Sequence, residues 1–464
     1  MPLYTKLYLL FFFIVFFAHY LIKRHKTTYT QAFLLLVSLA FYGYANLKFI
    51  PILLGVGLIT YASGLAIRSN HTKLIAGIFI AFELIPILTA RTLAFIPETS
   101  SLIIPLGISF FTLQAVTYTV SVYKGELEPE TSPITILAFV TFFPAISSGP
   151  IQRAKDLIPL LKSPNPEFDY NQSTDGLKLM AWGLFKKLVI ADNLALYIQG
   201  VRDPNAAPTA TALSLAAVLY SFQLYLDFSG YSDIAIGSAK ALGYDLKKNF
   251  DHPYLSKSVG EFWRRWHISL STWLRDYIYI PLGGSRKGEP ARYRNLLITF
   301  VISGLWHGAG ITWIVWGLYH GLCLCIENLL KMITGLKKIG MIPTFILVTF
   351  GWLIFSSPSL SVVASTITAF AQIPTEIASS LNSQLNSLQR LELLLMFPEG
   401  YNMIVSLIAL LIYLLISIRT KQTQGLDIIR SQKPYIRWPL YMLLALCILF
   451  FSAENSGEFI YNRF

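Results

Sequence analysis

Long apolar runs alternate with short, basic polar segments along almost the whole chain. A helix needs about 20 apolar residues to cross a bilayer, and about eleven runs approach that length as full or partial spans. The clearest runs occupy residues 4–22, 31–45, 49–67, 74–90, 101–123, 175–199, 209–226, 341–355, 403–418 and 438–451. This pattern predicts an all-α, polytopic integral membrane protein with about eleven transmembrane helices plus re-entrant segments.

Composition and charge agree with a membrane protein. The chain is 54% hydrophobic and only 13% charged, whereas soluble proteins carry about 25% charged residues. The net charge of +12 comes from Lys and Arg, which lie mainly in short loops, as expected for cytoplasmic loops and for contact with membrane lipid. No arginine-rich arm or base-stacking module is present, so we exclude nucleic acid as a partner. Residues 4–22 lack the basic start and cleavage site of a signal peptide, which predicts a retained first span. The basic residues 23–26 that follow should be cytoplasmic, which places the N-terminus outside.

Two stretches predict a chain that enters the membrane without fully crossing it. The basic residues that follow the short run 133–148 conflict with simple alternation of loops, so we expect a re-entrant or broken segment there. The 35-residue run 296–330 carries hardly a charge and has basic residues at both ends. As a helix it measures about 52 Å, less than the roughly 60 Å that two crossings require. We therefore expect a turn at the glycines of residues 304–310, with His307 at membrane depth.

Residues 228–294 have a different character, because basic and aromatic side chains are interleaved throughout. This predicts a layer of short helices on the cytoplasmic side. The layer can be a belt that binds lipid headgroups, or the mouth of a site for an anionic, phosphate-bearing cofactor. Arg264, Arg265 and Arg275 could bind phosphates through their guanidinium groups, or pair with nearby acids or headgroups.

The candidate chemistry is that of histidine in apolar surroundings. Burial favours the neutral imidazole, so His307 could act as a general base, although a core histidine with one hydrogen bond is the alternative. Trp306 and neighbouring indoles would keep the pocket dry and protect a reactive thioester. His267 could be a second catalytic or orienting group, or purely structural. His320 lies about 220° around a helix from His307 and is assigned to packing.

Asp227 and Ser229 directly follow the apolar run 209–226, where they could cap a helix or line a polar tunnel.

The absence of known catalytic motifs excludes several mechanisms. No phosphate-binding loop, serine-hydrolase elbow, zinc-protease motif or dinucleotide fingerprint is present, and we expect no metal site. The chain has no internal repeat, which weakens the hypothesis of a secondary transporter.

Four motifs bring a family into view. They are Tyr-Leu-Asp-Phe-Ser-Gly-Tyr-Ser-Asp at 225–233, Phe-Trp-Arg-Arg-Trp-His-Ile-Ser-Leu-Ser at 262–271, Leu-Arg-Asp-Tyr-Ile-Tyr-Ile-Pro-Leu-Gly-Gly at 274–284 and Gly-Leu-Trp-His-Gly at 304–308. Together they resemble the membrane-bound O-acyltransferase family, in the bacterial branch of alginate and peptidoglycan O-acetylation. The resemblance is densest over residues 220–330.

The resemblance implies helices around a central tunnel or funnel, in the cytoplasmic (inner) membrane of a bacterium. It implies acetyl-CoA as a donor substrate that enters from the cytoplasm, with no permanently bound cofactor. The family's key histidine matches His307, and its second polar position matches His267. We assign donor binding to Arg264, Arg265, Arg275, Trp306, Asp227 and Ser229. The resemblance also implies an SGNH esterase-like partner outside the cytoplasm and a polysaccharide acceptor.

We therefore expect a membrane O-acetyltransferase that moves an acetyl group across the membrane for O-acetylation of an exported cell-surface or cell-wall polysaccharide, directly or through the partner. The alternatives are D-alanyl transfer to teichoic acid from a carrier protein and transport of a polysaccharide or other solute. We expect one membrane-embedded domain over residues 1–464, with scaffold helices in 1–130, a catalytic core in 131–340 and C-terminal helices in 341–464.

Overall fold

The computed structural model of the chain describes residues 1–22, 26–94, 105, 107–163, 168–203, 205–336, 338–397, 402–419 and 432–453. It divides into two compact units. The first comprises Met1–Gly183 and Tyr231–Asn249, and the second comprises Leu184–Gly230 and Phe250–Phe464. Both units are built from helices, and the described part of the chain contains no strand. The predicted all-α class is confirmed.

The first unit is a set of helices that pack around α5. Its helices are α1 (Lys6–Ile22), α2 (Thr27–Asn46), α3 (Ile50–Ser69), α4 (Lys73–Ala94), α5 (Ile108–Tyr123), α6 (Pro133–Thr141), α7 (Phe143–Ile146), α8 (Ala154–Lys162) and α9 (Tyr170–Leu184). Helix α5 is buried on nearly all sides because α3, α4, α6 and α8 contact it. The first residues of the predicted span 101–123 lie outside the described residues, and α5 forms the remainder.

The predicted broken segment is confirmed as two short helices. Helix α6 ends at Thr141, and Phe142 leaves the helical region with φ −45° and ψ 103° before α7 begins. Ser132 caps the start of α6 by accepting a hydrogen bond from the backbone N–H of Thr135 at 3.4 Å. Every residue from Phe139 to Ile146 is buried, as irregular backbone in a membrane protein requires.

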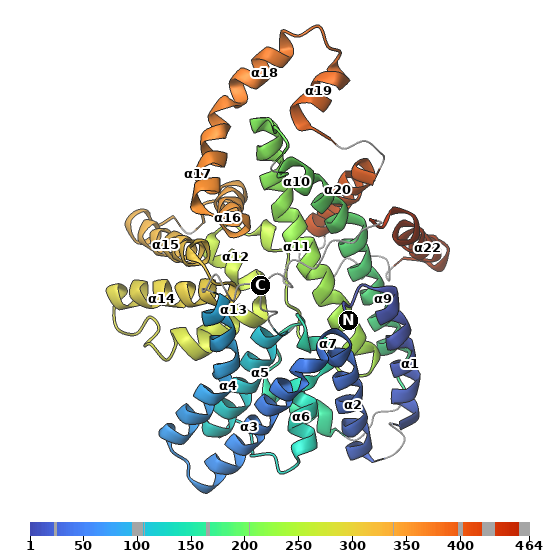
Figure 1. Ribbon diagram of the computed structural model, residues 1–464, viewed down its shortest axis with the longest axis vertical. Helices are drawn as coiled ribbons and strands as arrows, with labels where there is room; N and C mark the ends of the chain where they lie inside the picture. The colour runs from blue at the N-terminus through green and yellow to red at the C-terminus, as the bar shows by residue number, and fades with distance from the viewer. Residues whose placement is uncertain are drawn as a thin grey trace. The chain divides into compact units, whose positions relative to one another are not determined.

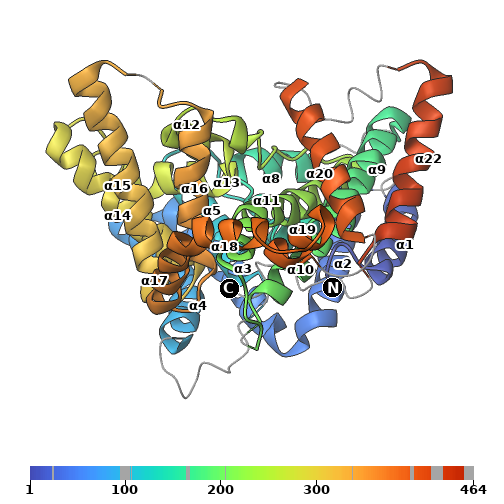
Figure 2. The same ribbon diagram turned by 90° about the horizontal axis from the view of Figure 1, so that it is seen from above.

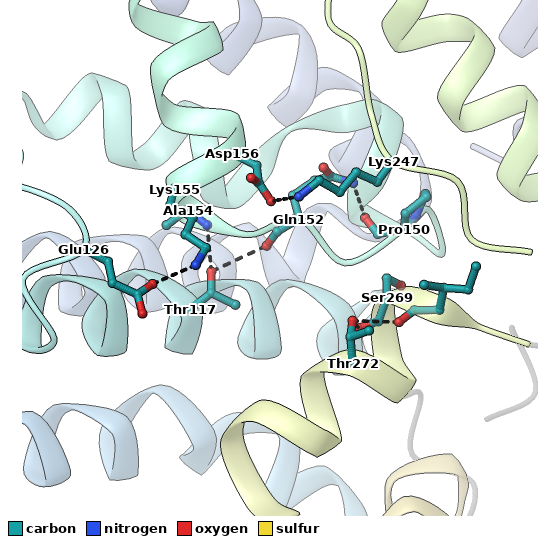
Figure 3. Close-up of polar contacts among 11 residues, drawn as sticks. Thr117, Glu126, Pro150, Gln152, Ala154, Lys155, Asp156, Lys247, Ser269 and Thr272 are labelled. Atoms are coloured by element: carbon teal, nitrogen blue, oxygen red, sulfur yellow. Dashed lines mark hydrogen bonds and ion pairs between the residues drawn. The ribbon is translucent and has the colours of Figure 1, made fainter. Parts of the chain in front are cut away.

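The loop between α7 and α8 is held by polar contacts from neighbouring segments of the same unit (Figure 3). The backbone N–H of Ala154 donates to the Thr117 hydroxyl at 3.0 Å, and that hydroxyl donates to the Gln152 carbonyl at 3.5 Å. Lys247 forms an ion pair with Asp156 at 2.6 Å. Because the Lys247 side chain is exposed, this pair contributes little to stability.

The second unit contains the longest helix and the short helices of the basic layer. Helix α11 (Ala210–Ala241) belongs to this unit up to Gly230, and its remainder belongs to the first unit. The other elements are the π-helical η3 (Phe185–Ala191), α10 (Asp192–Val201), η4 (Pro253–Leu255), α12 (Val259–Arg265), α13 (Ile268–Leu274), the π-helical η5 (Arg275–Tyr279), α14 (Glu289–His307), α15 (Ile311–Thr334), α16 (Met341–Ser356), α17 (Leu360–Ala369), η6 (Phe370–Gln372), α18 (Ile373–Leu381), α19 (Ser387–Leu395), α20 (Asn402–Arg419) and α22 (Pro434–Phe451).

Helices α14 and α15 form a tight antiparallel hairpin and lie side by side in both views (Figure 1, Figure 2). Glycines allow the two backbones to touch. A Cβ atom on Gly304 would lie 2.1 Å from the Trp313 carbonyl oxygen, and one on Gly317 would lie 2.2 Å from the Phe300 carbonyl oxygen. Small residues at such crossings are typical of membrane helix pairs. The predicted turn is confirmed, because α14 ends at His307 and α15 begins at Ile311.

Seven helices of the described part are long and apolar enough to cross a membrane. They are Leu47–Ser69, Lys73–Ala94, Ala210–Ala241, Ile311–Thr334, Leu360–Leu381, Asn402–Arg419 and Pro434–Phe451, with shorter apolar helices at Lys6–Ile22 and Met341–Ser356. A polytopic membrane protein is thereby confirmed, whereas the count of eleven spans stays a prediction.

Of the two roles left open for Asp227 and Ser229, capping of a helix end is excluded, because α11 continues through them to Ala241. The continuous burial of Leu224–Ser232 outweighs the helix-ending tendency of its Asp, Ser and Gly residues. His267 lies between two short helices, because α12 ends at Arg265 and α13 begins at Ile268.

Candidate active site

His307 is the last residue of α14 and is 4% exposed. Aromatic rings surround its imidazole. The ring centroids of Trp306, Trp316 and Phe355 lie 4.7, 5.1 and 5.4 Å away, and all three meet the imidazole edge-on. The aromatic environment expected from the sequence is present, and it excludes bulk water from most of the ring.

His267 joins α12 to α13 and is 1% exposed. Its backbone has φ 42° and ψ 55°, a left-handed conformation that most residues other than glycine avoid and that histidine adopts more often than most. Burial lowers the pKa of His267 to about 3, so the imidazole is neutral at neutral pH. Its ring lies 4.7 Å from Phe228 and 6.0 Å from Trp306.

Both imidazoles line one cavity of about 630 Å³ in the second unit, called the first cavity below. Its described lining includes the four cations Arg264, Arg275, Arg292 and Lys331, and the carboxylate Glu327. With neutral histidines the lining carries a formal charge of +3. A concave site of this size with convergent cations is suited to an anionic ligand.

The carboxylate of Glu327 is used to position α12. It accepts a hydrogen bond from the backbone N–H of Val259 at 2.6 Å and longer ones from Gly260. Ser258 accepts from the backbone N–H of Glu261 at 3.1 Å. Since the first N–H groups of a helix lack partners within the helix, these contacts fasten the start of α12 to α15. The cavity wall that carries Arg264 is thereby fixed against the hairpin.

The predicted donor-binding residues separate into groups. Arg264 and Arg275 line the first cavity, and Arg275 also pairs with Asp276 at 2.8 Å. Arg265 does not appear among the described lining residues and pairs with Glu261 at 2.8 Å.

Trp306 takes part indirectly, because its indole contacts the rings of both His267 and His307. It therefore links the two imidazoles through ring packing, and the described lining of the first cavity does not include it.

Asp227 lies at a second cavity of about 1060 Å³ in the same unit. The Lys187 ammonium lies 2.6 Å from an Asp192 carboxylate oxygen and 2.7 Å from an Asp227 carboxylate oxygen. All three side chains line this second cavity and are almost completely buried. Buried charges of this kind in a membrane protein indicate a functional site.

Ser229 belongs to the same region, because its hydroxyl accepts a hydrogen bond from the Lys186 ammonium at 3.0 Å. Both lysines lie in the π-helical turn Phe185–Ala191, and such turns are frequent at functional sites. This network was not predicted from the sequence. The available signal was the Lys-Lys pair inside the apolar run 175–199, which is costly unless the charges are paired.

His307 contacts aromatic rings that line the second cavity. Trp313 and Phe355 line the second cavity, and their ring centroids lie 6.3 and 5.4 Å from that of His307. His307 itself lines the first cavity. The imidazole therefore lines the cationic cavity and also contacts two rings that line the second cavity.

His320 is 1% exposed and packs among indole rings, with centroids 5.0 Å from Trp263 and 5.2 Å from Trp316. It is not among the described residues that line either cavity. The assignment of His320 to packing is confirmed. Among the residues that the structure describes, no group of three or more His, Cys, Asp or Glu side chains could hold a metal ion.

Comparison with known proteins identifies the family of the chain. The model of MBOAT, the membrane-bound O-acyltransferase family, matches residues 126–367. The chain is 33% identical to the probable alginate O-acetylase AlgI of Pseudomonas putida over 494 aligned residues, which cover 99% of each chain. It is 31% identical to the peptidoglycan O-acetyltransferase of Helicobacter pylori, over 94% of this chain and 92% of the relative. It is also 31% identical to the teichoic acid D-alanyltransferase of Streptococcus thermophilus, over 49% of this chain and 57% of the relative.

This protein belongs to the membrane-bound O-acyltransferase family. It is an O-acyltransferase and a multi-pass protein of the bacterial inner membrane. The resemblance seen in the motifs of residues 225–308 is confirmed, as is the branch that contains alginate and peptidoglycan O-acetyltransferases.

Proposed function

We propose that this protein transfers an acetyl group from cytoplasmic acetyl-CoA to a hydroxyl acceptor on the far side of the membrane, for O-acetylation of an exported polysaccharide. The acceptor is the polysaccharide itself or a hydroxyl of an SGNH esterase-like partner that passes the group on. One observation carries the proposal. The buried His307 imidazole faces a cationic cavity and also contacts the rings that line a second cavity.

The first cavity suits the donor. CoA carries phosphate groups, and four cations line the cavity against one carboxylate. Arg264 has no ion pair among the described residues, which leaves its guanidinium available for a phosphate. Such pairing would hold the nucleotide end while the thioester extends toward His307. The aromatic rings around His307 would then protect the thioester from hydrolysis.

The chemistry requires only a neutral imidazole at His307. One ring nitrogen takes the proton of the acceptor hydroxyl while its oxygen attacks the thioester carbonyl carbon. The tetrahedral intermediate then collapses, the carbon–sulfur bond breaks, and the imidazolium returns the proton to the leaving CoA sulfur. The products are the acetyl ester and CoA. His267 is neutral and acts as a hydrogen-bonding group that orients the donor or the acceptor.

The partial similarity to a teichoic acid D-alanyltransferase supports a second candidate, D-alanyl transfer from a carrier protein. The two candidates differ in the donor. Acetyl transfer needs free acetyl-CoA alone, whereas D-alanyl transfer needs the acylated carrier. A transporter would instead move its solute without any acyl donor.

The test is to incubate the purified full-length protein with acetyl-CoA labelled on the acetyl group and to measure label transferred to polysaccharide, with and without the partner. We expect His307→Ala to lower transfer by about 100-fold or more, since general base catalysis contributes about 10²–10⁴-fold. His71→Ala is the matched control, because His71 is an exposed histidine of the first unit. Full transfer by His307→Ala, or labelling that requires an acylated carrier protein, contradicts the proposal.

A further inference from the structure

The second cavity differs from the first in its charge. Two cations, Lys187 and Arg202, and three carboxylates, Asp192, Asp203 and Asp227, line its described part, a formal charge of −1. The first cavity carries +3. An anionic molecule is attracted to a positive lining and repelled by a negative one. The two cavities are therefore suited to ligands of different charge.

The cations of the second cavity already have partners. Lys187 is held between Asp192 and Asp227. The Arg202 guanidinium donates to the Ser356 hydroxyl at 3.1 Å and lies 5.0 Å from the centre of the Tyr220 ring. An anionic ligand would have to break these contacts, and a buried carboxylate that loses its cation is strongly destabilised.

Two acceptor oxygens at this cavity have no protein donor among the described residues. They are Oδ2 of Asp192 and Oε1 of Gln223. Asp192 is 2% exposed and Gln223 is 9% exposed. A buried acceptor without a donor costs about 1–3 kcal/mol, and more when it is charged. These oxygens are therefore suited to a ligand that brings hydrogen-bond donors.

The remaining lining fits a sugar ring. The half-buried Trp313 and the Phe355 ring provide aromatic surface, with ring centroids 4.6 Å apart. Thr312 and the serines 356, 357 and 359 add short hydroxyl groups. Apolar rings beside a few converging polar groups are typical of small-molecule sites.

We propose that the second cavity binds an uncharged, polyhydroxylated acceptor, a neutral saccharide unit, whose hydroxyl groups donate to Asp192 and Gln223. This inference rests on the proposed function, because it identifies the acceptor of the same transfer. Lys187 is a positioning residue that holds Asp192 in place. The wall formed by Trp313 and Phe355 directs one saccharide hydroxyl toward the side on which His307 lies.

The test measures binding without any acyl donor, so that it is independent of catalysis. Full-length protein in nanodiscs is titrated calorimetrically with cellotriose, with the matched uronate trimer of β-1,4-linked glucuronic acid, and with a short serine- and tyrosine-containing peptide. We expect cellotriose to bind at least tenfold more tightly than the uronate trimer and the peptide. The same result is expected with His307→Ala, so a failure of the acetyl-transfer assay and a failure of this test are distinguishable.

Variants locate the site. Asp192→Asn and Gln223→Leu are each expected to weaken cellotriose binding about tenfold, while Asp156→Asn, an acid of the first unit, leaves it unchanged. Thermal unfolding identifies any variant that fails to fold, and Gln223→Leu tests the site if Asp192→Asn does not fold. The proposal is overturned if neither trimer binds, if the uronate or the peptide binds as tightly as cellotriose, or if the folded variants bind like the parent.

Discussion

Gly304→Ala is the sharpest test of the idea that the α14–α15 hairpin positions His307. The added Cβ would lie 2.1 Å from the Trp313 carbonyl oxygen, whereas carbon and carbonyl oxygen normally approach to about 3.3 Å. Relief of this clash requires the two helices to separate by about 1 Å at a point one helical turn before His307. His307 would move with the end of α14.

The magnitude follows from two opposing effects. Overpacking of a close contact costs about 1–3 kcal/mol, and replacement of a helical glycine by alanine returns up to about 1 kcal/mol. We therefore expect a modest net loss of stability. A displacement of about 1 Å at a catalytic group can lower the rate about 100-fold, so activity should fall much more than stability.

The assay compares Gly304→Ala with Gly77→Ala on α4, where no heavy atom lies within 4 Å of the added Cβ. Thermal unfolding and the rate of labelled acetyl transfer are measured for both. The control should keep its rate and should not lose stability. If Gly304→Ala transfers acetyl as fast as Gly77→Ala, the hairpin contact does not position His307 and the reasoning is refuted.

Three further predictions concern charge. Lys187→Met should destabilise the protein by about 3–5 kcal/mol, because it leaves two buried carboxylates without their cation. Lys247→Met, at an exposed lysine, is the control and should change stability by under about 1 kcal/mol. Equal unfolding midpoints for the two variants would contradict this prediction. The pKa of His267 is about 3 in the folded protein and about 6.5 in the unfolded chain. Because the unfolded chain binds more protons between these two pH values, the free energy of unfolding should fall as the pH drops below about 6.5. The loss should be about 2 kcal/mol at pH 5. His267→Gln should remove that slope in an unfolding series, and an unchanged slope would assign it to other groups. Arg264→Gln should raise the KM for acetyl-CoA about tenfold with kcat unchanged, because it removes a charge-assisted contact made before the chemical step; a fall in kcat at constant KM would disagree.

The turn at His307 could be predicted from the sequence alone. Its prediction depended only on the length of an uncharged run and on the positions of its glycines, both of which are local properties. The broken segment at residues 133–148 was found in the same way, from a conflict between charge and alternation. In each case the membrane requires a minimum length for a crossing helix and favours basic residues in cytoplasmic loops. Both requirements can be checked in a single sequence. The roles of His307 and His267 remain predictions.

The Lys187 network could not be found by such rules. Lys187 and Asp227 are 40 positions apart and meet at 2.7 Å only because the π-helical turn packs against α11. The end of α11 was misjudged for a related reason. Asp, Ser and Gly favour helix ends in isolation, but burial of the whole segment outweighs that tendency.

The sequence by itself determined that this chain is a helical membrane protein, that it belongs to the O-acyltransferase family, and that a histidine lies at a glycine turn. Hydropathy, loop charge and motif spacing are local properties of the sequence, so each can be determined without coordinates. Only the tertiary structure decided that His307 lines a cationic cavity and contacts two rings of a second, anionic cavity, and that Asp227 pairs with Lys187 in the second. Cavities and ion pairs between distant segments depend on how helices pack, and packing depends on contacts that no local pattern records.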